Sequence, residues 1–131
     1  MYLLDTDILI YSLKGDPRVR ARLERHRSDP QAVSVISVME LYYGAYKSER
    51  TLSNLAKVRQ IEKTFPVLPL ASESAETFGS LKNSLESDGT RLEDFDLAIA
   101  ATALAHNLTL VSNNIRHFDR IDGLRLESWA D

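Results

Sequence analysis

Residues 93–114 read EDFDLAIAATALAHNLTLVSNN and carry the clearest structural signal in the chain. Positions 92–105 are predominantly apolar and strongly helical, and positions 108–111 form a short apolar strand that a polar turn follows at once. Short apolar strands that alternate with helices are typical of a parallel sheet that helices cover on both faces. This stretch therefore predicts an α/β fold.

The same alternation extends outward through the rest of the chain. Each predicted strand is short and apolar, and several helices begin or end at Asp, Pro or Gly. No repeat or linker interrupts the pattern, so we predict a single α/β domain over residues 1–131, with a short parallel sheet flanked by helices on both faces. We expect strands at 2–5, 32–36, 67–70, 108–111 and 124–126, and helices at 8–13, 17–27, 37–47, 51–63, 72–87, 92–105 and 113–118.

Composition excludes several classes of protein. The chain has 131 residues, 44% hydrophobic and 27% charged, which is ordinary for one globular domain with a sizeable core. It has no cysteine, so disulfides and cysteine-based metal sites are excluded. We see no signal peptide and no run of about 18 apolar residues, and we therefore expect a cytoplasmic protein with no membrane partner.

Charge is unevenly distributed along the chain. The net charge of −3 alone disfavours a nucleic-acid partner. Positions 14–27, however, read KGDPRVRARLERHR, with six basic residues (Arg18, Arg22 and Arg25 among them) against two acids, and a smaller basic group surrounds Arg116. A basic face on an acidic protein can meet phosphate, although a solvated helix face explains the pattern equally well.

Three acids stand out because of where they fall in the predicted elements. Asp5 ends the first strand and Asp7 follows two residues later, where the alternative role is helix capping. Asp96 lies about two turns into the predicted helix 92–105, in the most apolar part of the chain. Acids are almost never buried unless they are paired or bind a metal, which favours a functional role for Asp96.

Further polar residues follow the other strands. Glu40 comes after the predicted strand 32–36, although its spacing from Ser37 also fits a capping box. Ser112 and Asn114 follow the strand 108–111, where a polar turn is the alternative. A parallel sheet brings such positions to one edge, where crowded carboxylates repel unless a cation offsets them. The oxygen donors predict Mg²⁺ or Mn²⁺ and phosphoryl hydrolysis.

Four segments carry a resemblance to a known family. LLDTDILIY (3–11), SVMELYYGA (37–45), the block from Glu93 to Ile121 and GLRLESW (123–129) resemble the PIN-domain family. The likeness is strongest to its VapC toxins, the ribonuclease halves of toxin–antitoxin pairs. The resemblance implies a metal-dependent endoribonuclease that acts on tRNA or another structured RNA, with a homodimer and a cognate antitoxin as its protein assemblies.

The resemblance also assigns roles to residues. It implies that Asp5 and Asp96 bind Mg²⁺ or Mn²⁺ and that Glu40 completes the catalytic set, while Ser112 matches a polar position of the family. Two positions depart from the pattern, because Asp7 stands where the family often has Asn and Asn114 stands where a fourth acid falls. The number of metal ions and the role of Asp7 therefore stay open.

The residues leave two alternative functions and one alternative surface. A receiver-like phosphoacceptor domain also gathers acids at strand ends, but it needs a lysine after a late strand, and none follows Val111. A catalytically silent RNA-binding module is expected to have lost one of the acids Asp5, Glu40 and Asp96, and all three are present. Leu41, Tyr42, Tyr43 and Tyr46 form a strip at helical spacing that fits either a dimer face or the core. Under the nuclease hypothesis, the candidate RNA contacts are Arg18, Arg22, Arg25 and Arg116.

Overall fold

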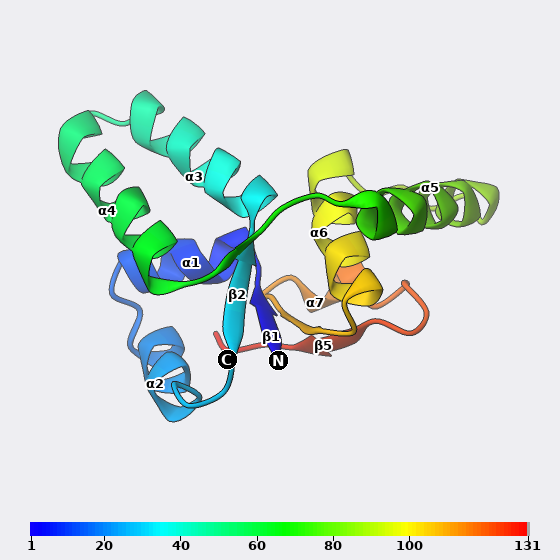
Figure 1. Cartoon of the computed structure of the whole chain (residues 1–131), viewed down its shortest axis with the longest axis horizontal. Coiled ribbons are helices and arrows are strands. Elements are labelled where there is room, and N and C mark those ends of the chain that lie inside the picture. The colour runs from blue at the N-terminus through cyan, green and yellow to red at the C-terminus, as the bar shows by residue number, and fades with distance from the viewer. Residues whose placement is uncertain (131) are drawn as a thin grey trace.

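Five strands form one parallel sheet in the order β3-β2-β1-β4-β5. The computed structural model describes residues 1–130 (Figure 1). The strands are β1 (Tyr2–Leu4), β2 (Gln31–Ser34), β3 (Val67–Leu68), β4 (Thr109–Val111) and β5 (Arg125–Glu127). The helices are α1 (Thr6–Leu13), α2 (Pro17–Arg25), α3 (Val35–Lys47), α4 (Thr51–Thr64), α5 (Ser72–Ser87), α6 (Asp94–Ala105) and α7 (Ile115–Phe118). The predicted α/β fold with a short parallel sheet is confirmed.

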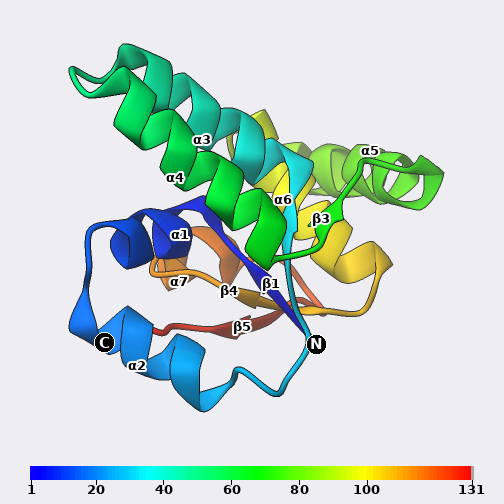
Figure 2. The same cartoon turned by 60° about the vertical axis from the view of Figure 1, so that its left-hand side comes forward.

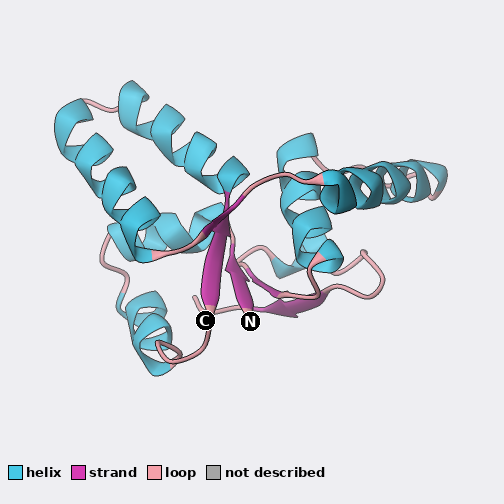
Figure 3. Ribbon diagram, viewed as in Figure 1, coloured by secondary structure: helices cyan, strands magenta, loops and turns pink. Residues whose placement is uncertain are grey.

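Helices cover both faces of this sheet, as predicted (Figure 3). Alternate residues of β1 point to opposite faces, so Leu4 joins the core with α1, α3 and α4, and Leu3 joins the core with α5, α6 and α7. Both side chains are completely buried. The continuous apolar character of the strands therefore reflects burial on two sides, which is the usual condition of a parallel sheet.

The central strand marks the point where the chain changes direction across the sheet. β2 and β3 lie on one side of β1, and β4 and β5 lie on the other. Leu4 of β1 pairs with both Val33 and Val111, so three strands end at the same level. In open parallel sheets this switch point, beyond the carboxyl ends of the strands, is where ligands bind.

Four helices, α1, α3, α6 and α7, begin at a different residue than the sequence predicted, and the starts of α3 and α6 bear on the candidate acids. β2 ends at Ser34 and α3 begins at Val35, because the Ser34 hydroxyl accepts a hydrogen bond from Ile36 N at 3.0 Å. The predicted capping box between Ser37 and Glu40 is therefore wrong. α6 begins at Asp94, which places Asp96 in its first turn rather than two turns inside the helix.

Trp129, near the C-terminal end of the chain, packs beside the start of β1. The Trp129 side chain is completely buried, and its ring stacks on His26 with 4.8 Å between ring centroids. β5 lies one residue later than predicted. Within residues 1–130, none of the helices has the length and apolar character that a membrane crossing requires.

Candidate active site

Asp5 occupies the carboxyl end of β1, at the switch point of the sheet. Its side chain is 5% exposed. Its Oδ1 accepts a hydrogen bond from Thr6 N and its Oδ2 accepts one from the Ser112 hydroxyl, each at 2.8 Å. Asp5 is also the N-cap of α1, so the capping interpretation is confirmed for this residue. One carboxylate thus joins β1, α1 and the end of β4.

Asp7 faces the same strand end from the first turn of α1. Its Oδ2 accepts a hydrogen bond from Asn113 N at 3.0 Å and lies 3.4 Å from the Ser112 hydroxyl. Its Oδ1 is buried and lacks a hydrogen-bond partner. Buried polar atoms are normally satisfied, so this carboxylate oxygen is available to a water molecule or a cation.

Glu40 reaches this edge from α3. Its Oε1 accepts a hydrogen bond from the Thr6 hydroxyl at 2.7 Å, and the same hydroxyl lies 2.8 Å from Ser37 Oγ. Thr6 therefore links α1 to α3, between the side chains of Asp5 and Glu40. The sequence analysis did not identify Thr6, because its partner lies 34 positions away along the chain.

Asp96 enters from α6 and meets a histidine. Its Oδ2 lies 3.0 Å from Nε2 of His117 on α7. The Asp96 side chain is 27% exposed, so it is not enclosed in the apolar core that its sequence context suggested. The next residues of α6, Leu97 and Ile99, are buried instead. The sequence analysis assigned no role at the site to His117.

The surroundings of the site disfavour the ionised forms of its carboxylic acids. Burial raises the pKa of Asp5 to about 7, and the charges of Asp7 and Asp96 add to this effect. Burial likewise raises the pKa values of Asp7 and Glu40, again with a contribution from Asp96. A cation among these carboxylates would favour their ionised forms. The metal-free protein therefore holds carboxylates that a positive ion would stabilise.

These residues fit a divalent metal ion by their donor chemistry. They supply oxygen ligands of the type that Mg²⁺ and Mn²⁺ take, and Asp7 Oδ1 is a buried oxygen without a partner. Within residues 1–130, no three acidic or histidine side chains are already arranged to hold an ion. The donors therefore gather at the carboxyl ends of the strands without being preassembled.

Asn114 and Ser112 differ in what they contribute. Ser112 is completely buried between Asp5 and the backbone N of Asn114, which donates to its hydroxyl oxygen at 3.0 Å. Asn114 itself is exposed, and it is the N-cap residue of α7 without a side-chain capping bond. Its amide is therefore exposed to solvent at the start of α7.

The basic residues of α2 do not join the acids. Figures 1 and 2 show α2 at the end of the sheet opposite the start of α3. His26, at the C-terminal end of α2, lies 5.1 Å from the Tyr2 ring at the beginning of β1. Arg22 Nη1 donates to Ser128 O at 3.4 Å. An RNA-binding role for α2 thus requires a substrate that extends well beyond the acids.

Comparison with known proteins gives a consistent result. The family model described as PIN domain matches residues 2–124. The chain is 38% identical to "Ribonuclease VapC2" of Haemophilus influenzae, over 98% of each chain. It is 35% identical to "tRNA(fMet)-specific endonuclease VapC" of Shigella flexneri, again over 98% of each. Among solved structures, VapBC2 of Rickettsia felis bound to a promoter DNA fragment superposes with a TM-score of 0.92 at 34% identity, covering 98% of each chain.

Proposed function

Because the chain belongs to the PIN-domain family, we propose that it is a metal-dependent endoribonuclease, the toxin of a toxin–antitoxin pair, that hydrolyses phosphodiester bonds in tRNA or another structured RNA. The curated relatives include ribonucleases, and one is named for its action on tRNA(fMet). The observation that carries the proposal is the group of raised-pKa carboxylates at the switch point, with the unpaired Oδ1 of Asp7 among them.

The candidate catalytic residues have different roles in this proposal. Asp5 and Asp96 would hold Mg²⁺ or Mn²⁺, and Glu40 would complete the set. When bound, such an ion lowers the pKa of a water molecule and offsets the charge that develops on the phosphate and the leaving oxygen. Thr6 fixes Oε1 of Glu40 by a hydrogen bond. The other oxygen, Oε2, can then take the proton of the water that attacks phosphorus.

Ser112 and Asp7 have a supporting role in this proposal. The Ser112 hydroxyl orients Asp5 through a 2.8 Å hydrogen bond. Asp7 holds the loop after β4 through Asn113 N, which keeps Ser112 in place. Asn114 and Arg116 are exposed at and just after the start of α7, and in this proposal they would contact the RNA.

A cleavage assay tests the proposal directly. The purified chain, free of antitoxin, is incubated with bulk tRNA and Mg²⁺ or Mn²⁺, beside Asp96→Asn and the matched control Asp94→Asn. Asp94 is two residues away on the same helix, but it is exposed and paired with Lys82. We expect discrete fragments from the wild type and from Asp94→Asn, and none with chelator or with Asp96→Asn.

Other outcomes separate the alternatives. RNA binding without cleavage, unaffected by chelator, would point to a catalytically silent RNA-binding module. Cleavage that persists in folded Asp96→Asn would contradict the assigned site. A receiver-like phosphoacceptor is not favoured, because Ser112, Asn113 and Asn114 follow β4 where that class needs a lysine.

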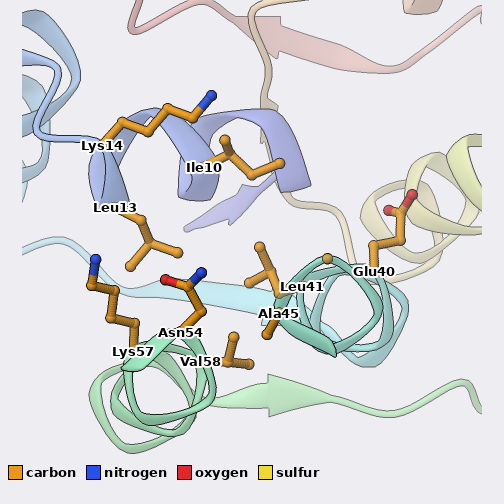
Figure 4. A pocket seen from close by; sticks show the side chains of 10 residues that line it. Ile10, Leu13, Lys14, Glu40, Leu41, Ala45, Asn54, Lys57 and Val58 are labelled. Atoms are coloured by element: carbon orange, nitrogen blue, oxygen red, sulfur yellow. The ribbon is translucent and has the colours of Figure 1, made fainter. Parts of the chain in front are cut away.

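A groove between α1, α3 and α4 supports the antitoxin as partner (Figure 4). It has a volume of about 330 Å³ and an apolar floor that includes Leu13, Leu41 and Val58, and its lining extends to Glu40. The solved relatives include VapBC complexes. An antitoxin segment in this groove would lie beside the catalytic carboxylate, and Leu13→Asp is expected to weaken capture of the co-expressed antitoxin.

We also propose a homodimer, but only part of the strip that the sequence predicted as its face is exposed. Leu41 is buried in the core, and Tyr42 is half-buried beside Glu62. Tyr43 and Tyr46 are each 67% exposed, and they are the aromatic residues of α3 that a second copy can cover. Sedimentation of Tyr43→Ser with Tyr46→Ser tests whether this face joins two chains.

A further inference from the structure

His117 is the side chain at this site to which the proposed function gives no role. Its Nε2 lies 3.0 Å from Oδ2 of Asp96, and the two side chains are 29% and 27% exposed. The ring meets Phe118 edge-on at 5.4 Å between centroids, and Phe118 is completely buried. The helix α7 therefore holds an imidazole nitrogen beside one of the carboxylates assigned to the metal.

We propose, resting on the function proposed above, that His117 is a nitrogen ligand of the same metal ion as Asp96, and that it shifts the site from Mg²⁺ toward Mn²⁺. Histidine is a common metal ligand through a neutral ring nitrogen. The proposal thus adds a nitrogen donor to the oxygen ligands of Asp5 and Asp96.

The distance between the two side chains fits this role. Two atoms on adjacent corners of an octahedron, each about 2.1 Å from the ion, are separated by about 3.0 Å. The nitrogen and the oxygen are 3.0 Å apart. A direct hydrogen bond between the two atoms has the same length. Nitrogen coupling to bound Mn²⁺, rather than the distance, therefore identifies a metal ligand.

The charge of the site favours an uncharged ligand in this position. Asp96 already adds repulsion to the ionised forms of Asp5, Asp7 and Glu40. A further carboxylate would add to this repulsion, whereas a neutral imidazole supplies a donor without a negative charge. Mg²⁺ binds imidazole poorly and prefers oxygen, while transition ions accept nitrogen more readily. A nitrogen ligand therefore changes which ion the site holds best.

Pulsed electron paramagnetic resonance on bound Mn²⁺ tests the coordination itself. The full chain, free of antitoxin and without an affinity tag, is loaded with Mn²⁺, and coupling to a ¹⁴N nucleus is measured. We expect nitrogen coupling in the wild type, and its loss in His117→Gln. The matched control is His106→Gln, because His106 is exposed at the far end of α6. That variant should keep the coupling.

Calorimetric titration gives a second readout that does not depend on activity. We expect His117→Gln to weaken Mn²⁺ binding about tenfold or more and Mg²⁺ binding less than about threefold. His117→Glu exchanges nitrogen for oxygen, so it should lower the ratio of Mn²⁺ to Mg²⁺ affinity while it retains binding of both ions. Circular dichroism confirms that each variant is folded before titration.

The outcomes distinguish this inference from the proposed function. Mn²⁺ binding that needs Asp96 but shows no nitrogen coupling in the wild type overturns the inference and leaves the metallonuclease standing. Equal losses of Mn²⁺ and Mg²⁺ affinity in His117→Gln overturn it as well, because a residue that only orients Asp96 affects both ions alike. Absence of any Mn²⁺ or Mg²⁺ binding overturns both proposals.

Discussion

Replacing Asp5 by Asn should reverse its effect on stability between acidic and alkaline pH. Burial raises the pKa of Asp5 from 3.8 to about 7 in the folded protein. The folded protein therefore disfavours the ionised form, so the stability contributed by the protonated form is complete below pH 4. It is lost as the pH rises through 7. Asn does not ionise in this range, and it escapes that loss.

The raised pKa of Asp5 sets the size of the expected change in stability. A difference of about 3 pH units corresponds to about 4 kcal/mol, which is the upper limit of the gain at pH 8. Asn has only one acceptor oxygen, so it can keep the hydrogen bond from Thr6 N, while its NH₂ group faces the Ser112 hydroxyl and cannot accept that bond. The loss costs about 1–2 kcal/mol. We therefore expect Asp5→Asn in the presence of chelator to be about 2 kcal/mol more stable than the wild type at pH 8, about equally stable at pH 5, and less stable only below that pH.

Urea denaturation at pH 5, 6, 7 and 8 in the presence of chelator measures this difference. The exposed Asp122→Asn is the control, and its effect should not change sign with pH. Saturating Mn²⁺ should stabilise the wild type and leave Asp5→Asn unchanged, because the ion binds only the folded site. A difference between Asp5→Asn and the wild type that stays constant across these pH values would refute the reasoning.

Three further substitutions test other parts of the structure. Thr6→Val removes the hydroxyl that fixes Glu40, so the cleavage rate should fall about tenfold in single-turnover assays while circular dichroism stays unchanged. Arg25→Glu should reduce the slope of log affinity against log salt by about 1 if α2 contacts RNA, and an unchanged slope in binding titrations would remove α2 from the interface. Phe118→Ala opens a cavity below α7 and should cost about 3–5 kcal/mol in urea denaturation, whereas equal stability would show that this side chain does not anchor the helix.

Much of the fold could be predicted from the sequence because local patterns and tertiary packing agree. The apolar strands 2–4 and 109–111 are buried on both faces, so their continuous apolar character identified them directly. The start of α3 was harder, since Val35 and Ile36 are β-branched and favour a strand by local preference. The Ser34 hydroxyl overrides that preference by capping the helix.

The site, like the fold, includes contacts that the sequence predicted and contacts that it did not. Asp5 and Ser112 were predicted to meet because both follow strands, and parallel strands end together. The partners of Glu40 and Asp96 were not predicted, because Thr6 and His117 carry no local signal of their roles. Their contacts join residues 34 and 21 positions apart, and only the packing of α1 on α3 and of α6 beside α7 creates them.

The same long-range contacts connect metal binding to the stability of the fold. Asp5 directly follows the central strand, Glu40 lies on α3 and Asp96 lies on α6, so the three carboxylates come from different elements of the fold. Repulsion among their carboxylates works against this arrangement when no cation is present. An ion held by Asp5 and Asp96, beside Glu40, would therefore replace repulsion with attraction across the sheet edge. Its binding energy should resist the separation of α3 and α6 as well as global unfolding, and the same ion would prepare the site for a phosphate.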